Sequence, residues 1–435
     1  MDFAEAVRYL YGLGHETLAM KLGLENIERL LDELGKPHEK FPSVQIAGTN
    51  GKGSVAVMLD AICRAAGIRT GLYTSPHLVS ITERIRIGGR EITQEDFARH
   101  ASRVRTEAEM IERETGALPT FFEQVTATAL LAFADAQIEL AILETGLGGR
   151  LDATTAARAR AVAITPIDFD HQEYLGSTLA AIAAEKAAII RPGTRAVIAP
   201  QHPEARRVIE RRCRECEVTP RIVYPNFEIR GSSDLGRLRL DFATEEDRYE
   251  NVRLNLRGRH QAVNAAVAIA LAETLREDGF AISREAIIEG LETVEHAGRL
   301  ELLETRPKML LDGAHNAASA RALREFLDEF VRSPITLIFG AMRDKDLTEI
   351  ARILFPAARE LILTRVANER AATIATLVEA APRDFDRRKI KTAGSVAEAL
   401  ARARDLTPDD GLICVTGSLY LIGETKAALG PATAI

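Results

Sequence analysis

The chain has 435 residues, of which 46% are hydrophobic and 27% are charged, and its formal net charge at pH 7 is −7. That length exceeds one ordinary core, so we expect two domains, and the four cysteines indicate a soluble protein of the reducing cytoplasm. The negative balance excludes a nucleic-acid partner bound through a basic surface, and no apolar run approaches the ~20 residues of a membrane span.

The first candidate site is a glycine-rich loop that follows a short apolar strand. Residues 1–40 predict two short helices, and a strand tip at Val44 and Ile46 then leads into Gly48–Ser54 and a helix. Glycines let backbone N–H groups approach a phosphate, and the helix N-terminus adds partial positive charge. Lys52 can reach the terminal phosphates, and the Ser54 hydroxyl can bind Mg²⁺. Although its spacing departs from the plain Walker form, we interpret this loop as a nucleotide site.

The next two segments leave two interpretations open. A strand over 70–74 enters the turn Ser75-Pro76-His77, where Ser75 and His77 either contact a ligand or only satisfy the turn. A helix over 94–115 precedes Thr120-Phe121-Phe122-Glu123. The two aromatic rings could stack on a flat heterocycle, with Glu123 accepting from its N–H groups. On the residues alone, core packing at a helix start with Thr120 and Glu123 as a capping box is the better interpretation.

Two buried strands carry polar side chains at their carboxyl ends. Residues 138–143 run into Glu144 and a glycine-rich turn to Asp152, and residues 161–165 run into Asp168-Phe169-Asp170-His171. Strand ends of this kind form the ligand edge of open α/β sheets. We therefore assign Glu144 to Mg²⁺, directly or through water, and expect neutral His171 as a second metal ligand.

A helix predicted over 178–190 carries a lysine on its apolar face. Lys186 lies within the stripe formed by Leu179, Ile182, Ile189 and Ile190. A lysine at that position snorkels to solvent, loses its proton or is covalently changed. Snorkelling is the common outcome, and the sequence alone does not select among the three.

The remaining pattern predicts the fold class. Alternating residues over 221–256 indicate a small antiparallel sheet, and residues 258–264 open an alanine-rich helix. Strand-and-turn units then recur at 309–316, 335–340, 361–364 and 412–418. We predict an α/β protein: a P-loop ATPase domain with a mostly parallel sheet plus the small antiparallel sheet over 1–295, and a smaller Rossmann-like α/β domain over 296–435.

Taken together, these motifs resemble the folylpolyglutamate synthase/dihydrofolate synthase branch of the Mur ligase family. The resemblance spans residues from about 20 to about 425, and the motifs stand in the family's order. They are Gly48–Ser54, Ser75–Leu78, Phe122-Glu123, Glu144–Thr154, Asp170-His171, Glu185–Ala187, His260–Ala265, Gly298-Arg299, Asp312–Asn316 and Gly417–Leu421. The chain departs from the pattern at Thr155, Ala317 and His296, the last standing where a tryptophan often precedes Gly298-Arg299.

The resemblance implies an ATP-dependent ligase that adds L-glutamate to a folate or dihydropteroate carboxylate through an acyl phosphate. It implies catalytic roles for Lys52, Lys186 and His315, and metal ligation by Ser54, Glu144, His171 and a carbamylated Lys186. Implied nucleotide contacts are Thr49, Asn50, Gly51, Lys52, Gly53, Ser54, Asn264, Arg299 and Asp312. Implied substrate contacts are Ser75, His77, Thr120, Phe121, Phe122, Glu123, Arg150, Asp152 and Ser418.

Two rival functions differ from this one in testable ways. A cell-wall Mur-type amino-acid ligase would use the same machinery, but the ~40 residues before the phosphate loop leave no room for a separate UDP-binding domain. A catalytically silent nucleotide-binding regulator should carry damaged chemistry, yet Lys52, Glu144 and Lys186 are all present. We expect a monomer with small-molecule substrates only.

Overall fold

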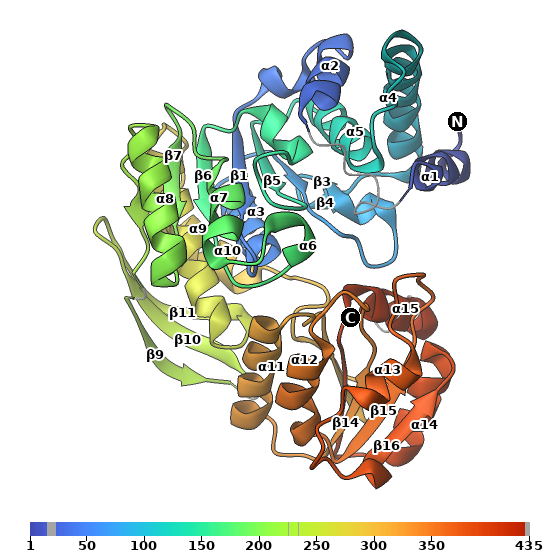
Figure 1. Cartoon of the computed structure of the whole chain (residues 1–435). Coiled ribbons are helices and arrows are strands. Elements are labelled where there is room, and N and C mark those ends of the chain that lie inside the picture. Colours follow the sequence, from blue (N-terminus) through green and yellow to red (C-terminus); the bar gives the residue numbers. More distant parts are fainter. Residues whose placement is uncertain (15–22, 225, 234, 431–435) are drawn as a thin grey trace.

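The protein is described by a computed structural model covering residues 1–14, 23–224, 226–233 and 235–430 (Figure 1). Within these residues the strands form an eight-stranded, a three-stranded and a six-stranded sheet. The two larger sheets belong to separate units, which Figure 1 shows as an upper blue-to-yellow part and a lower orange-to-red part. No helix in the described ranges is both long and apolar enough to cross a membrane.

The eight-stranded sheet has the order β4-β3-β2-β5-β1-β6-β7-β8. The six neighbouring strands β2, β5, β1, β6, β7 and β8 are parallel. This confirms the mostly parallel sheet. The antiparallel edge strands β3 and β4 were not predicted, and Arg221-Ile222 pairs with β7 rather than opening the small antiparallel sheet. The strands are β1 (Ser43–Ala47), β2 (Thr70–Tyr73), β3 (Ile85–Ile87), β4 (Arg90–Glu91), β5 (Leu140–Glu144), β6 (Ala161–Ile164), β7 (Arg195–Ile198) and β8 (Arg221–Ile222).

Helices cover both faces of this sheet. On one face α3 lies beneath α9 and α10, and its residues from Gly53 to Cys63 are all buried, as expected for a helix packed on several sides. The other face carries two groups, one around α4 and α5 and one around α7 and α8. The helices are α1 (Phe3–Gly12), α2 (Glu25–Glu33), α3 (Lys52–Ala65), α4 (Gln94–Thr115), α5 (Phe121–Asp135), α6 (Gln172–Leu175), α7 (Leu179–Ala187), α8 (Pro203–Glu215), α9 (His260–Glu277) and α10 (Arg284–Thr293).

The three-stranded antiparallel sheet consists of β9 (Phe227–Ser232), β10 (Arg237–Ala243) and β11 (Arg248–Arg257). Alternate residues of β10, namely Leu238, Leu240 and Phe242, are buried in the core shared with α3 and α9. The residues between them face outward, so the predicted sheet with one solvated face is confirmed.

The six-stranded sheet has the order β12-β13-β17-β14-β15-β16, and helices lie on both of its faces. The Rossmann-like prediction is confirmed, although antiparallel β12 and edge strand β16 were missed. The strands are β12 (Glu301–Leu303), β13 (Lys308–Asp312), β14 (Ile335–Phe339), β15 (Glu360–Thr364), β16 (Ile390–Ala393) and β17 (Leu412–Thr416). The helices are α11 (Ala317–Phe330), α12 (Leu347–Leu354), α13 (Ile374–Glu379), α14 (Val396–Leu406) and α15 (Leu419–Leu429).

Candidate active site

The loop between β1 and α3 is shaped to receive an anion. Gly51 has a left-handed φ of 89°, and a Cβ there would lie 2.4 Å from Asn264 Oδ1, so only glycine fits. Gly51 supplies no side-chain cap to α3, and the first N–H groups of this 14-residue helix remain for a ligand. Lys52 Nζ donates to the backbone oxygens of Gly48 at 3.1 Å and Thr49 at 3.2 Å, which curls it over the loop.

A cavity of about 370 Å³ opens in front of this loop and is lined by both domains. The first domain contributes the ends of β1, β5 and β6 and the start of α9, and the second contributes the end of β13 and the start of α11. Thus all the predicted nucleotide contacts meet here with four other predicted catalytic or metal residues. The shared set is Thr49, Asn50, Gly51, Lys52, Gly53, Ser54, Glu144, His171, Lys186, Asn264, Arg299, Asp312 and His315.

The residues expected to hold Mg²⁺ fit a divalent cation. Glu144 is buried, which raises its pKa, and one of its oxygens accepts from Ser75 N–H at 3.2 Å. Burial lowers the pKa of His171 to about 4, so its ring is neutral, and its buried Nδ1 has no hydrogen-bond partner among the described residues. No cluster of three or more His, Cys, Asp or Glu able to hold a metal occurs in those residues. A cation at Glu144 and His171 would therefore take its other ligands from phosphate oxygens and the Ser54 hydroxyl.

Lys186 neither snorkels nor reaches a carboxylate. Only 4% of the residue is exposed, and its Nζ donates to the backbone oxygen of Gly48 at 2.8 Å. Burial, reinforced by the charge of Lys52, lowers the pKa of Lys186 to about 7. The helix that carries it ends at Ala187 rather than at Ile190, because Pro192 disfavours helical geometry just beyond.

A second cavity, of about 210 Å³, adjoins the first. Thr120 and Glu123 form the expected capping box of α5, and Phe122 projects beside them. From the second domain come Lys345, Arg370 and Tyr420. The predicted substrate contacts that line it are Ser75, Thr120, Phe122, Glu123, Asp152 and Ser418.

Three predicted substrate contacts line neither cavity in the described structure. Phe121 is buried and stacks on Tyr11 at 5.9 Å between ring centroids, and His77 accepts from Arg84 Nε at 2.8 Å. Both border a further cavity of about 340 Å³. Arg150 forms an exposed ion pair with Glu185 at 2.7 Å. Asp152 does line the second cavity, but its carboxylate accepts from Gly146 and Leu147 N–H and so shapes the glycine-rich turn.

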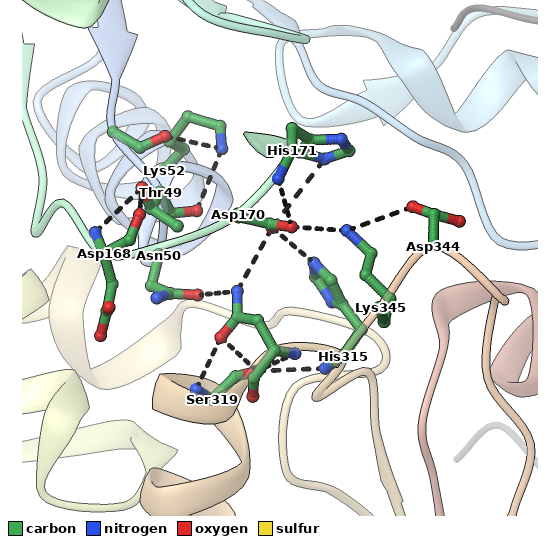
Figure 2. Close-up of polar contacts among 12 residues, drawn as sticks. Thr49, Asn50, Lys52, Asp168, Asp170, His171, His315, Ser319, Asp344 and Lys345 are labelled. Carbon is green, nitrogen blue, oxygen red and sulfur yellow. Dashed lines mark hydrogen bonds and ion pairs between the residues drawn. The ribbon is translucent and has the colours of Figure 1, made fainter. Parts of the chain in front are cut away.

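The sequence did not predict the polar cluster in which Asp170 contacts His315 and Lys345 of the second domain (Figure 2). Asp170 pairs with Lys345 Nζ at 2.5 Å and faces His315 Nε2 at 3.5 Å. Burial alone raises the pKa of Asp170, but hydrogen bonding and the charges of His315, His171 and Lys345 outweigh it and hold that pKa well below its usual range. Asn316 Nδ2 donates to Asn50 Oδ1 at 3.1 Å and so links the two domains beside the cluster. The available signal was the polar run after β14, which contains Lys345.

Comparisons with known proteins agree with this arrangement. The Mur ligase middle domain matches residues 46–272, and the Mur ligase, glutamate ligase domain matches residues 298–419. Dihydrofolate synthase/folylpolyglutamate synthase of Bacillus subtilis is 33% identical over 96% of this chain and 97% of its own. The probable bifunctional folylpolyglutamate synthase/dihydropteroate synthase of Haloferax volcanii is 38% identical over 98% of this chain, which spans only 50% of that relative.

Solved structures show the same similarity along the chain. Mycobacterium tuberculosis folylpolyglutamate synthase complexed with ADP has a TM-score of 0.92 at 32% identity and covers 98% of both chains. Bifunctional folylpolyglutamate synthase/dihydrofolate synthase from Yersinia pestis, complexed with AMPPNP and a Mn ion, has a TM-score of 0.85 at 28% identity. That match covers 99% of this chain and 98% of the Yersinia pestis chain.

A phosphate loop facing a second α/β domain across a shared cavity defines a ligase of the Mur type, and the chain belongs to the Mur ligase family. Within that family it belongs to the folylpolyglutamate synthases and dihydrofolate synthases. The resemblance stated from the motifs is therefore confirmed.

Proposed function

We propose that the protein is an ATP- and Mg²⁺-dependent carbon–nitrogen ligase that adds L-glutamate to folate and also to dihydropteroate. The observation that carries this proposal is the shared wall of the two cavities. Ser75, His171 and His315 line both, so the terminal phosphate in one cavity would meet an acceptor carboxylate in the other. Relatives solved with ADP or with AMPPNP and Mn support the choice of nucleotide and metal.

The reaction that fits this geometry has two transfers. A carboxylate oxygen of the acceptor attacks the γ-phosphorus, and the bond from phosphorus to the β,γ-bridging oxygen breaks. ADP is released, and the acceptor is now an acyl phosphate. The glutamate amine then attacks the acyl carbon, the carbon–oxygen bond to phosphate breaks, and the amine loses a proton. When bound, Mg²⁺ offsets the charge of the transferring phosphoryl group, and Ser54, Glu144 and His171 would hold it.

Residues of this chain supply the positioning. Lys52 and the α3 N–H groups would bind the phosphates, and Arg299 and Asp312 would reach the nucleotide from the second domain. The Nδ1–H of His315 donates to the Gly313 carbonyl at 2.8 Å, which turns its Nε2 toward Asp170 and the shared wall. Closure of the two domains over both ligands would exclude water from the acyl phosphate.

Glutamate brings two carboxylates and needs cations that face the acceptor cavity. Lys345 and Arg370 line that cavity with little exposure, at 8% and 18% of their side chains. Asp344 lies 3.0 Å from Arg370, and a substrate carboxylate would displace it there. Lys345 lies 3.9 Å from Asp344 but only 2.5 Å from Asp170, which would hold it in place beside the substrate. On the other side Phe122 and Tyr420 offer aromatic faces to the pteridine or benzoyl ring of the acceptor.

Two further expectations accompany this function. We place the domain boundary between residues 295 and 296, in the connection that separates α10 from β12. We also keep the expectation of a cytoplasmic monomer without a nucleic-acid partner. The net charge of −7 supports only the last of these three points.

The direct test is ADP release measured with L-glutamate and one acceptor at a time. Tetrahydrofolate and dihydropteroate should each stimulate ADP release, and mass spectrometry should find each acceptor extended by one glutamate. A UDP-linked cell-wall precursor is the acceptor that a cell-wall Mur-type ligase would use, and with this protein it should give no product. A rate of ADP release that no folate or pteroate acceptor stimulates would contradict the proposal.

A further inference from the structure

A histidine in the connection between the two domains reaches back to the phosphate loop. His296 lies between α10 and β12 and is partly buried, and its Nδ1 is 3.3 Å from Ser54 Oγ. The ring does not appear among the described residues that line the nucleotide cavity. His296 therefore contacts Ser54 without itself lining that cavity.

The hydrogen bonds around Ser54 assign a direction to its hydroxyl. Asn264 Nδ2 donates to Gln261 Oε1 at 2.9 Å, which fixes the orientation of the Gln261 amide. The other end of that amide, Nε2, then donates to Ser54 Oγ at 3.3 Å. A serine hydroxyl has one proton and two lone pairs, so one lone pair is used by Gln261. The proton can go to the neutral His296 ring, which leaves the second lone pair for the cavity.

The His296 imidazole packs directly against the phosphate loop at Gly53. A Cβ added to Gly53 would lie 3.0 Å from His296 Cε1 and 3.3 Å from Glu144 Oε1. Gly53 is the residue that separates Lys52 from Ser54 and makes the loop depart from the plain Walker form. The extra glycine thus provides the space in which the His296 ring lies against the loop.

We propose that His296 is a positioning residue for Ser54: it accepts the hydroxyl proton and thereby keeps a lone pair of Ser54 Oγ directed at the divalent cation of the bound nucleotide. This inference rests on the proposed nucleotide and metal site and adds a residue to it. A substitution of His296 should therefore change binding of the cation only, because within the described residues the ring lines neither the nucleotide cavity nor the acceptor cavity.

The test compares two variants of nearly equal shape. In His296→Asn the oxygen Oδ1 is attached to Cγ, as Nδ1 is in histidine, so an acceptor remains, whereas His296→Leu has the same branching and no acceptor. Binding of AMPPNP to the full chain is measured by calorimetry with Mg²⁺ and again with EDTA. We expect the Mg²⁺-dependent gain in affinity to fall about fivefold in His296→Leu, the size of one net hydrogen bond, and about twofold or less in His296→Asn. Affinity in EDTA should agree among the three proteins within about twofold.

A double-mutant cycle separates positioning from loop support. In a Ser54→Ala background, His296→Leu should cause no further loss of the Mg²⁺-dependent gain, because no hydroxyl remains to be oriented. Equal losses with Mg²⁺ and with EDTA, an unchanged gain in His296→Leu, or an Asn variant as weak as the Leu variant would each overturn the inference. If the native chain shows no Mg²⁺-dependent gain at all, the proposed nucleotide and metal site itself fails, which is a distinguishable result.

Discussion

The two ends of the active site are built in different ways. At the phosphate end, backbone does most of the binding: a glycine loop and the start of α3, held by contacts within the first domain. At the acceptor end, charged side chains from both domains converge, with Asp170 of the first domain paired to Lys345 of the second. The phosphate loop is held by contacts within the first domain, whereas the charged cluster of the acceptor end forms only when the two domains are docked. Four predictions test this contrast.

The largest effect is expected at the phosphate end, from Glu144→Ala. Loss of the carboxylate that would hold the metal should reduce kcat by about 10³-fold or more, since the charge on the transferring phosphoryl group loses its counter-ion. The fold should survive, because within the described residues the Glu144 side chain accepts a single hydrogen bond, from Ser75 N–H. The measurement is steady-state turnover with circular dichroism as the control. Near-native turnover at ordinary Mg²⁺ levels would refute the metal assignment.

Lys186 should give the next largest effect, and one that depends on CO₂. With its pKa near 7, a sizeable fraction of the amine is neutral at physiological pH and can add CO₂ to form a carbamate. At fixed dissolved CO₂ the neutral fraction rises with pH, so activity should rise through pH 7. Lys186→Ala should lose on the order of 10²-fold in rate, and a short added carboxylate should restore part of it.

Removal of CO₂ gives the control for that prediction. The native chain should lose activity in CO₂-free buffer and regain it with bicarbonate. A structure with unmodified Lys186 beside occupied nucleotide and metal sites would exclude the carbamate.

At the acceptor end, Lys345→Ala should affect glutamate and spare the nucleotide. We expect KM for L-glutamate to rise about tenfold, as for a lost charge-assisted contact, while KM for ATP changes less than about twofold. Lys308→Ala is the matched control, because Lys308 is also a second-domain lysine and forms an exposed ion pair with Glu304 at 3.3 Å. Equal rises in both KM values would show that the two ends are not separable in this way.

The smallest effect is expected where the two ends touch, at Asn316. Asn316→Ser keeps a capping oxygen for α11 but removes the amide that donates to Asn50 across the domains. We expect kcat/KM to fall about threefold, as for one partly buried hydrogen bond, with Tm nearly unchanged. An unchanged kcat/KM would mean that this contact contributes nothing to closure.

The same contrast explains what the sequence could predict. The phosphate loop, Glu144 and the buried Lys186 were readable because each is marked by its own neighbours along the chain. Asp170 was noted as a strand-end residue, but its pairing with Lys345 was not predicted, because that partner lies in the other domain, about 175 residues away in sequence. The missed strands β3, β4, β7, β12 and β16 are short, and their two to four residues carry too little periodicity to predict a strand. Phe121 and Phe122 are adjacent, yet one stacks in the core and the other lines a cavity, a choice fixed by helix rotation.

The connection from Val294 to Leu300 is tied at both ends, to the first domain through Asn255 Nδ2 and Val294 O, and to the second through Leu300 N and Asp312. Between these ties stand His296 and Arg299, one beside Ser54 and the other in the nucleotide cavity. The connection between the domains therefore also carries residues of the proposed ATP site, and a change in the angle between the domains would move them. Thermodynamic reciprocity then requires that whatever factor ATP adds to the affinity for glutamate, glutamate returns to ATP. Synergy between the two substrates would therefore be measurable as equal shifts, in the same direction, of the two dissociation constants.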